Sequence, residues 1–312
     1  MAFAQGSRSS LAFIAETTFG TTPTTPTFAN LPINSHSLDL TKDRVAGNEI
    51  QADRMPRVDR HGNKQAGGSI EVDLRKGDFD TLIESAMLNT WDATPAAAPD
   101  LIKVGVTPKF MTMEDAANDI SQFRLFTGLA VSSMSVSIAP NQMVTGTFDM
   151  VGQGMVQTGA TGSTGGAVTA SSANQPFDSY SGTITDGGTG IAIVTSIDFS
   201  VTNSFAPTFV VGSAIAPQLE FGRAVVEGTM TVYYEDETLI NKFLNETESA
   251  IVINVNDPSS ASQYTFTFPR VKYNGAAVPL ANPESRLVTL PFVALFDSTL
   301  STNLMINRPD TT

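Results

Sequence analysis

The sequence predicts a mainly β protein with short helices, arranged as two tandem domains of similar design. Three observations support this fold class. Apolar and polar residues alternate with a period of two over many short segments, which is typical of half-buried strands. Two of these segments lead directly into a stretch with helical spacing, at Gly68–Met87 and again at Gly228–Leu244. The two halves of the chain repeat these elements in the same order, which favours an ancestral duplication.

The composition narrows the possible functions. The chain has 312 residues, 41% of them hydrophobic, and a formal net charge of -13. That charge argues against nucleic-acid binding by phosphate neutralisation, which requires clustered Lys and Arg. There are no cysteines, so disulfides, thiolate metal sites and a cysteine nucleophile are excluded. No segment approaches the ~20 apolar residues of a membrane helix, and a signal-peptide pattern is missing. We therefore expect a soluble, unsecreted protein without membrane insertion.

The first regular element follows an irregular N-terminus. Residues 1–32 are expected to form an arm that docks through the apolar cluster around Phe13, with a frayed terminus as the alternative. A strand is expected over Ser37–Thr41. The segment Lys42–Gly67 has mixed charges and no sustained period, so it predicts a protruding loop that meets a partner's acidic surface. A mobile loop is the alternative. The charged residues assigned to this loop's contact are Arg44, Glu49, Asp53, Arg54, Arg57 and Arg60.

The segment Gly68–Met87 predicts a strand followed by a helix. Ile70, Val72 and Leu74 alternate with polar residues, so one face of the strand is expected to be buried. Asp78 is expected to cap the helix that follows. The helix has a continuous apolar stripe that is expected to close the core from outside; the stripe consists of Phe79, Leu82, Ile83, Ala86 and Met87.

The remaining elements complete the two domains. Alternation over 133–138 and 144–150, with a turn between them, predicts a β-hairpin. The composition then changes to Gly, Ser, Thr and Ala, which predicts a flexible linker or surface loop over 153–192. The second half repeats the order of the first. The expected domains are therefore 33–152 and 193–312.

Catalysis is not supported by the sequence. The chain has two histidines, His36 and His61, and neither is part of a triad or of a metal-ligand spacing. Asp115 and Asp119 are four residues apart and would share a helical face, but solvated surface carboxylates are the simpler interpretation. The Gly-rich segment lacks the Lys-Ser/Thr pair with which a phosphate-binding loop ends. No enzyme activity, cofactor or metal is expected; a hydrolase using Asp115 or His61 is the weakest alternative.

The polar faces of the expected strands carry acids among Ser and Thr, and neither Lys nor Arg at matching positions. Such a smooth acidic face suits the wall of a conduit through which phosphate passes without sticking. An ordinary solvated face is the alternative, given the net charge. The carboxylates expected to line a channel are Asp39, Glu71, Asp73, Asp149, Asp198 and Glu227.

An ordered set of segments covers most of the chain. These are GNEIQADRMPRV (47–58), GGSIEVDLRKGDFDTLIESAM (67–87), FRLFTGLAVSSMSVSIAPNQMVTGTFDMVG (123–152), VVEGTMTVYYEDETLINKFLNET (225–247) and YTFTFPRVKY (264–273). Taken together, these segments resemble the major tail tube proteins of long-tailed bacteriophages.

The resemblance implies β-sandwich or barrel domains, each flanked by a helix, that assemble into rings and stack into a tube. It implies that strands of neighbouring domains join in one barrel around a lumen, and that loop 42–67 stacks onto the adjacent ring. With two domains per chain, rings of three subunits with pseudo-sixfold symmetry are expected, a homohexamer being the alternative. The implied lumen strands are 37–41, 69–74, 132–138, 144–150, 197–202, 226–233, 265–271 and 287–295.

The same resemblance implies a location and partners. The protein is expected in the virion tail, after assembly in the host cytoplasm, beside other tail proteins such as the tape measure and the tail terminator. Double-stranded DNA would pass through transiently and without specific binding. A soluble binding module of the adhesin or lectin type is the alternative function. It needs an aromatic-lined concave site, for which one Trp and five Tyr give little support.

Overall fold

The computed structural model describes residues 3–50, 52–53, 55–93, 99–159, 168–191, 193–258, 262–280, 283 and 285–309. It confirms a mainly β fold with two short helices, α1 (Asp80–Met87) and α2 (Thr238–Leu244), after a short 3-10 turn at Gly6–Arg8. The strands are β1 (Ser9–Glu16), β2 (Phe28–Leu31), β3 (Ser35–His36), β4 (Asp39–Ala46), β5 (Asp59–Asp73), β6 (Asp100–Lys103), β7 (Phe110–Ala117), β8 (Gln122–Ile138), β9 (Thr145–Gly152), β10 (Gly154–Thr158), β11 (Val168–Thr169), β12 (Thr183–Asp186), β13 (Thr189–Gly190), β14 (Val194–Thr202), β15 (Ala206–Thr208), β16 (Gln218–Glu220), β17 (Val225–Tyr233), β18 (Ser249–Asn256), β19 (Gln263–Tyr273), β20 (Leu287–Ala294) and β21 (Met305–Arg308).

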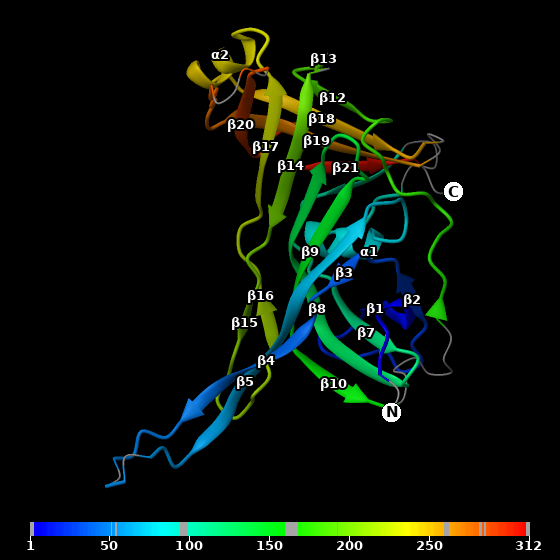
Figure 1. Ribbon diagram of the computed structural model, residues 1–312, viewed down its shortest axis with the longest axis vertical. Helices are drawn as coiled ribbons and strands as arrows, with labels where there is room; N and C mark the ends of the chain where they lie inside the picture. Colours follow the sequence, from blue (N-terminus) through cyan, green and yellow to red (C-terminus); the bar gives the residue numbers. More distant parts are fainter. Residues whose placement is uncertain are drawn as a thin grey trace.

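One long curled antiparallel sheet, which we call the wall, runs through both halves of the molecule (Figure 1). Its order is β3/β4–β5–β9–β8 in the first half and β14–β17–β20–β19 in the second. The two halves meet where β8 pairs with β14, from Ile138 opposite Ile197 to Ser133 opposite Thr202. The wall is therefore continuous across the boundary between the halves.

A second layer covers the apolar face of the wall. In the first half it contains β1, β2, β7, β10 and the N-terminal part of β8; in the second half it contains β12, β18, β21 and β6. The predicted N-terminal arm contains β1, which pairs with β7 along its whole length. Ile70, Val72 and Leu74 are buried as predicted. Their burial orients the whole strand, because successive side chains point to opposite faces.

The two helices cover the core unequally. On α1, the side chains of Leu82, Ile83, Ala86 and Met87 are buried, and the helix contacts β8, β14 and β6. On α2 no residue is fully buried. The predicted cap of α1 is wrong, because the N-cap position is Phe79. Asp78 instead accepts a hydrogen bond from the Ser172 backbone N–H at 2.7 Å.

The segment Lys42–Gly67 is not the loop that the sequence predicted. β4 and β5 continue as a hairpin to the pair Ala46–Asp59, so the connection between strands is confined to residues 47–58. Figure 1 shows this hairpin, which we call the first arm, projecting away from the body of the molecule. Residues of β4 beyond Leu40 are exposed on both faces. The apolar alternation that identifies a strand is missing because no core covers either face.

Two further expectations are corrected by strand pairing. The expected lumen strand Thr265–Val271 joins the wall only at its end: β19 pairs with β20 over Val271–Tyr273, and its earlier residues pair with β18 and β21 in the second layer. The expected linker 153–192 contains β10, which pairs with β8, and β12, which pairs with β18. Phe177 in this segment is fully buried, and its backbone bonds Leu74 and Val144. Residues 160–167 lie outside the described part of the chain.

Candidate functional site: the polar face of the wall and the first arm

The polar side chains of the wall form rows that cross neighbouring strands between β3 and β17. One row runs from Ser35 through Glu71, Thr147 and Ser135 to Ser200 and Glu227, each residue opposite the next on a neighbouring strand. A second row runs from Asp73 through Thr145 and Ser137 to Asp198 and Thr229. Directly opposite residues in antiparallel strands point to the same face. The period-two pattern of separate segments therefore becomes one shared surface, the polar face.

All six carboxylates selected from the sequence are positioned on this polar face. Asp39, Glu71, Asp149, Asp198 and Glu227 are exposed, and Asp73 is half-buried. Hydroxyl and amide donors from neighbouring strands hold several of them. Asn34 donates to Asp73 at 2.8 Å, Ser35 to Glu71 at 3.2 Å, Ser133 to Asp149 at 3.2 Å, and Ser137 to Asp198.

The polar face is hollowed at the junction of the two halves. An open depression of about 520 Å³ spans β9, β8, β14 and β17. It is lined by hydroxyls and two of the six carboxylates, Asp198 and Glu227. Gly228 lies beside it, and a Cβ at this position would meet the Phe292 ring at 2.4 Å and the Asp198 carbonyl oxygen at 2.7 Å. The close approach of β14 to β17 therefore requires glycine here.

Two cations that the sequence did not point to lie at the margins of this face. Lys272 stands opposite Val293 on the same side as Glu227, at the β19 edge of the wall, and its ammonium pairs with Glu246. Arg124 lies 3.8 Å from Asp39. Neither was found from the sequence, because the pairing of β19 and the approach of β8 to β4 depend on long-range contacts.

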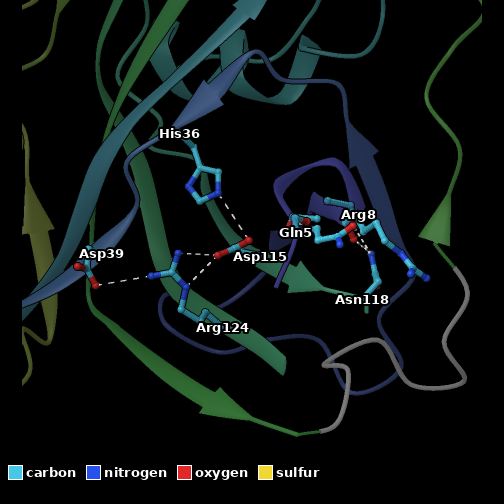
Figure 2. A network of polar contacts seen from close by, with 9 residues as sticks. Gln5, Arg8, His36, Asp39, Asp115, Asn118 and Arg124 are labelled. Carbon is cyan, nitrogen blue, oxygen red and sulfur yellow. Dashed lines mark hydrogen bonds and ion pairs between the residues drawn. The ribbon is translucent and has the colours of Figure 1, made fainter. Parts of the chain in front are cut away.

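Figure 2 shows the polar network around Arg124. Its guanidinium donates to Asp115 at 2.6 and 2.8 Å, and His36 lies 3.6 Å from the other oxygen of the same carboxylate. Burial raises the pKa of Asp115, but the hydrogen bonds and charge of Arg124, together with the nearby His36, outweigh it, so the pKa lies below its usual value. The network ties the wall strands β3 and β4 to the second layer at β7 and β8.

The first arm has charged sides and an apolar tip. Arg44 pairs with Asp59 at 2.8 Å, and Arg57 pairs with Asp53, so these ions are satisfied within the arm. Arg60 and Glu49 are exposed on the arm, and Arg54 lies outside the described residues. Large apolar side chains are exposed around the connection between the strands: Val45 at 55%, Ile50 at 99%, Met55 at 67% and Val58 at 42%.

A family model described as phage tail tube protein matches residues 6–294, nearly the whole chain. The chain belongs to the phage tail tube protein family. Comparison with curated proteins gave no match. Family membership makes this a structural protein of the bacteriophage tail, as the order of segments indicated, and it implies self-assembly into a tube beside other tail proteins.

The structure locates the residues that the sequence offered as catalytic or metal-binding candidates in this tail tube protein. Across the described ranges, no group of three or more His, Cys, Asp and Glu side chains is positioned to hold a metal ion. Asp115 is ion-paired in the second layer, whereas His61 is exposed on the first arm. Asp115 and Asp119 do not share a helical face, because Asp115 lies in strand β7, which extends to Ala117. No described helix is long and apolar enough to cross a membrane.

Proposed function

We propose that three copies of this tail tube protein close into a ring, and that stacked rings form a conduit whose lining is the polar face of the wall. The observation that carries this proposal is the pairing of β8 with β14. It is a joint between two similar four-stranded units, and it leaves a wall with two further ends. A repeated unit with two complementary ends generates a closed ring when its rotation allows closure.

The two ends of the wall have the features of such a joint. In the described residues, β3 and β4 pair with β5 on one side and with no strand on the other. At the far end, residues 274–280 run beside β20, with Asn274 bonded to Pro291 and Ala277 to Thr289. In the second half, residues 274–280 follow the second-layer strand β19. In the first half, Ser132–Ile138 follow the second-layer part of β8 in the same way and belong to the wall. Joining the two ends between copies removes the exposed edges that otherwise invite aggregation.

The dimensions are compatible with duplex DNA. Three copies of an eight-stranded wall supply about 24 strands, and at ~4.8 Å spacing and ~45° tilt the barrel would be roughly 50 Å across. Side chains reduce the open width to roughly 40 Å. A duplex of about 20 Å, as its groove depths indicate, passes with room for water and ions.

The charge of the polar face fits passage without adhesion. Five of its six selected carboxylates are exposed, and the basic side chains at its margins are paired with acids. DNA phosphates would meet repulsion and hydroxyl groups instead of the Lys and Arg contacts that give tight binding. The lining is therefore proposed to act without catalysis, cofactor or specific recognition. The first arm, with Arg44, Glu49, Asp53, Arg54, Arg57 and Arg60, is proposed to contact the adjacent ring.

Electron microscopy of the purified protein, together with native mass spectrometry of the rings, tests the proposal. Tubes built from rings of three chains are the expected result. Rings of six chains would contradict the proposed number of chains per ring but leave the proposed conduit function intact. Compact monomers at every concentration and salt, with no tube, would refute the function. No observation on the described residues favours the adhesin-like alternative.

A further inference from the structure

The second half carries a counterpart of the first arm. It consists of residues 203–224, including the short hairpin β15–β16, and we call it the second arm. Each arm connects the first two wall strands of its half. The segments that lead into the returning strand of each arm also correspond: Met-Pro-Arg-Val at 55–58 in the first arm matches Ala-Pro-Gln-Leu at 216–219 in the second. Met55 and Val58 therefore correspond to Ala216 and Leu219.

The second arm is packed against the first half of its own chain. Ala216 is 1% exposed and Leu219 is 5% exposed. Leu219 lies in an apolar cluster with Leu88 and Ala130, against which Val151 packs. Two hydrogen bonds hold the backbone in place: Gln153 Nε2 donates to the Ala216 carbonyl oxygen at 2.9 Å, and the Lys64 N–H donates to the Ala214 carbonyl oxygen at 2.8 Å.

The first arm has apolar residues at the corresponding positions, but no described part of the chain packs over them. Met55 and Val58 are 67% and 42% exposed, although their counterparts in the second arm are buried. The polar sides of the first arm do not explain this exposure, because Arg57 is already paired with Asp53. Among the described residues of the first arm, Met55 and Val58 are therefore apolar side chains exposed without a covering surface.

Strand register locates the surface that would cover them. Gly67 pairs with Val151 in the first half, and Glu227 pairs with Val293 in the second. Gly68 and Gly228 are equivalent, since a Cβ on either would collide with the carbonyl oxygen of the neighbouring wall strand, at 2.4 and 2.7 Å. Counting from these pairs, Val151 corresponds to Val293.

The same count gives the counterparts of the two residues that bond the second arm. Gln153 corresponds to Leu295, and Lys64 corresponds to Ala224. Leu295, Ala224 and Val293 all line one open apolar groove of about 530 Å³. Val106 and Phe296 in the same groove are 76% and 61% exposed. The second half therefore presents an uncovered version of the surface that the first half uses.

We propose that this groove receives the Met55–Val58 segment of a second copy of the chain, as the first half receives Ala216–Leu219 within the chain. The contact is apolar, and it joins neighbours in one ring, because the second arm packs across the β8–β14 joint in the same way. This inference rests on the proposed ring. It differs from stacking through arginines, since it gives the first arm a role in closing the ring itself.

Cysteine cross-linking tests the contact, because the native sequence has no cysteine. A double variant, Met55→Cys with Leu295→Cys, is assembled and treated with a short bismaleimide. The expected result is a denaturing-gel ladder that ends at the number of chains per ring found by native mass spectrometry. The matched control is Val211→Cys with Leu295→Cys, since Val211 is fully exposed on the second arm. This control pair should give no ladder.

The remaining outcomes separate this inference from the proposed function. Tubes that form normally but give no ladder would overturn the groove contact and leave the conduit intact. A ladder extending past one ring would also overturn it, because the arm would then reach the next ring. Monomers without rings would refute both. As a second readout, Met55→Asp with Val58→Asp should reduce ring yield at least tenfold with an unchanged circular-dichroism spectrum, whereas Val211→Asp should change the yield less than twofold.

Discussion

Replacing Arg308 by methionine is expected to destabilise the subunit by about 3–5 kcal/mol. Arg308 ends β21, and its side chain is 9% exposed. Its Nε donates to Asp100 at 2.9 Å, a second guanidinium nitrogen pairs with Asp80, and the group lies 4.3 Å from the Trp91 ring centre. Asp80 also accepts a hydrogen bond from Tyr264 at 2.9 Å. One cation thus holds the C-terminal strand to α1 and β6.

The magnitude follows from burial. Asp100 is 1% exposed, so removing Arg308 takes away the cation that compensates a carboxylate with little access to water. Breaking a buried pair in this way costs about 3–5 kcal/mol, which is roughly two to three and a half powers of ten in the folding equilibrium. The matched control is Arg270→Met. Arg270 pairs with Glu248 where both side chains are 43% exposed, and such a pair contributes about 0–1 kcal/mol.

Urea unfolding of the unassembled subunit, followed by far-UV circular dichroism, measures the difference. Trp91, the one tryptophan of the sequence, gives a second signal from the site itself. Equal midpoints for the Arg308 and Arg270 variants would refute the reasoning. Adding Asp80→Asn and Asp100→Asn to Arg308→Met should recover much of the loss, because the uncompensated charges are removed.

Three other perturbations have definite expected results. Because the pKa of Asp115 is lowered in the folded state, its contribution to stability is fully present above the usual pKa of 3.8 and is lost as pH falls through the folded-state pKa. Acidification should therefore destabilise the native protein more than the Asp115→Asn variant. Urea midpoints measured at several pH values would show the difference. Gly228→Ala should cost about 1–3 kcal/mol by the same measurement, because the added Cβ overlaps Phe292. Glu71→Lys with Asp73→Lys should allow rings to assemble but slow DNA ejection from particles, because phosphates would bind the lining.

Each of these has a control. Gly190→Ala should be nearly neutral, since nothing lies within 4 Å of the added Cβ, and an equal loss at Gly228 and Gly190 would contradict the packing argument. Glu237→Lys, at the exposed start of α2, changes charge away from the wall. Normal ejection by the Glu71 and Asp73 variant would show that the acidic lining is not needed. Parallel pH curves for native protein and Asp115→Asn would exclude the network as the acid-sensitive element.

The polar face of the wall and the positions of the two helices could be predicted from the sequence, because both depend on local periodicity. Ile70, Val72 and Leu74 alternate with Ser69, Glu71 and Asp73, so one strand separates buried from exposed positions without knowledge of its neighbours. The hairpin of β8 and β9 was confirmed for the same reason. The apolar stripe of α1 was correct, although its cap was not, because Asp78 finds a more distant partner in Ser172.

The layers and the arms could not be predicted, because they depend on pairing between distant residues. β2 pairs with β11 across more than a hundred residues, in a parallel register that no local pattern specifies. β19 changes partners along its length, from β18 to β20, while its alternation continues unchanged. The first arm is a strand pair without a core, so the signal that identifies strands elsewhere is lost there.

The pairing of β8 with β14 has a consequence for how assembly depends on dilution. Two units joined by a covalent tether meet at an effective concentration that the tether sets, in the millimolar range for a short connection, whatever the amount of protein in solution. In the proposed ring, every second seam would therefore form as the chain folds. Dilution would open only the seams between chains, and the smallest piece released would always be a two-unit segment of tube wall.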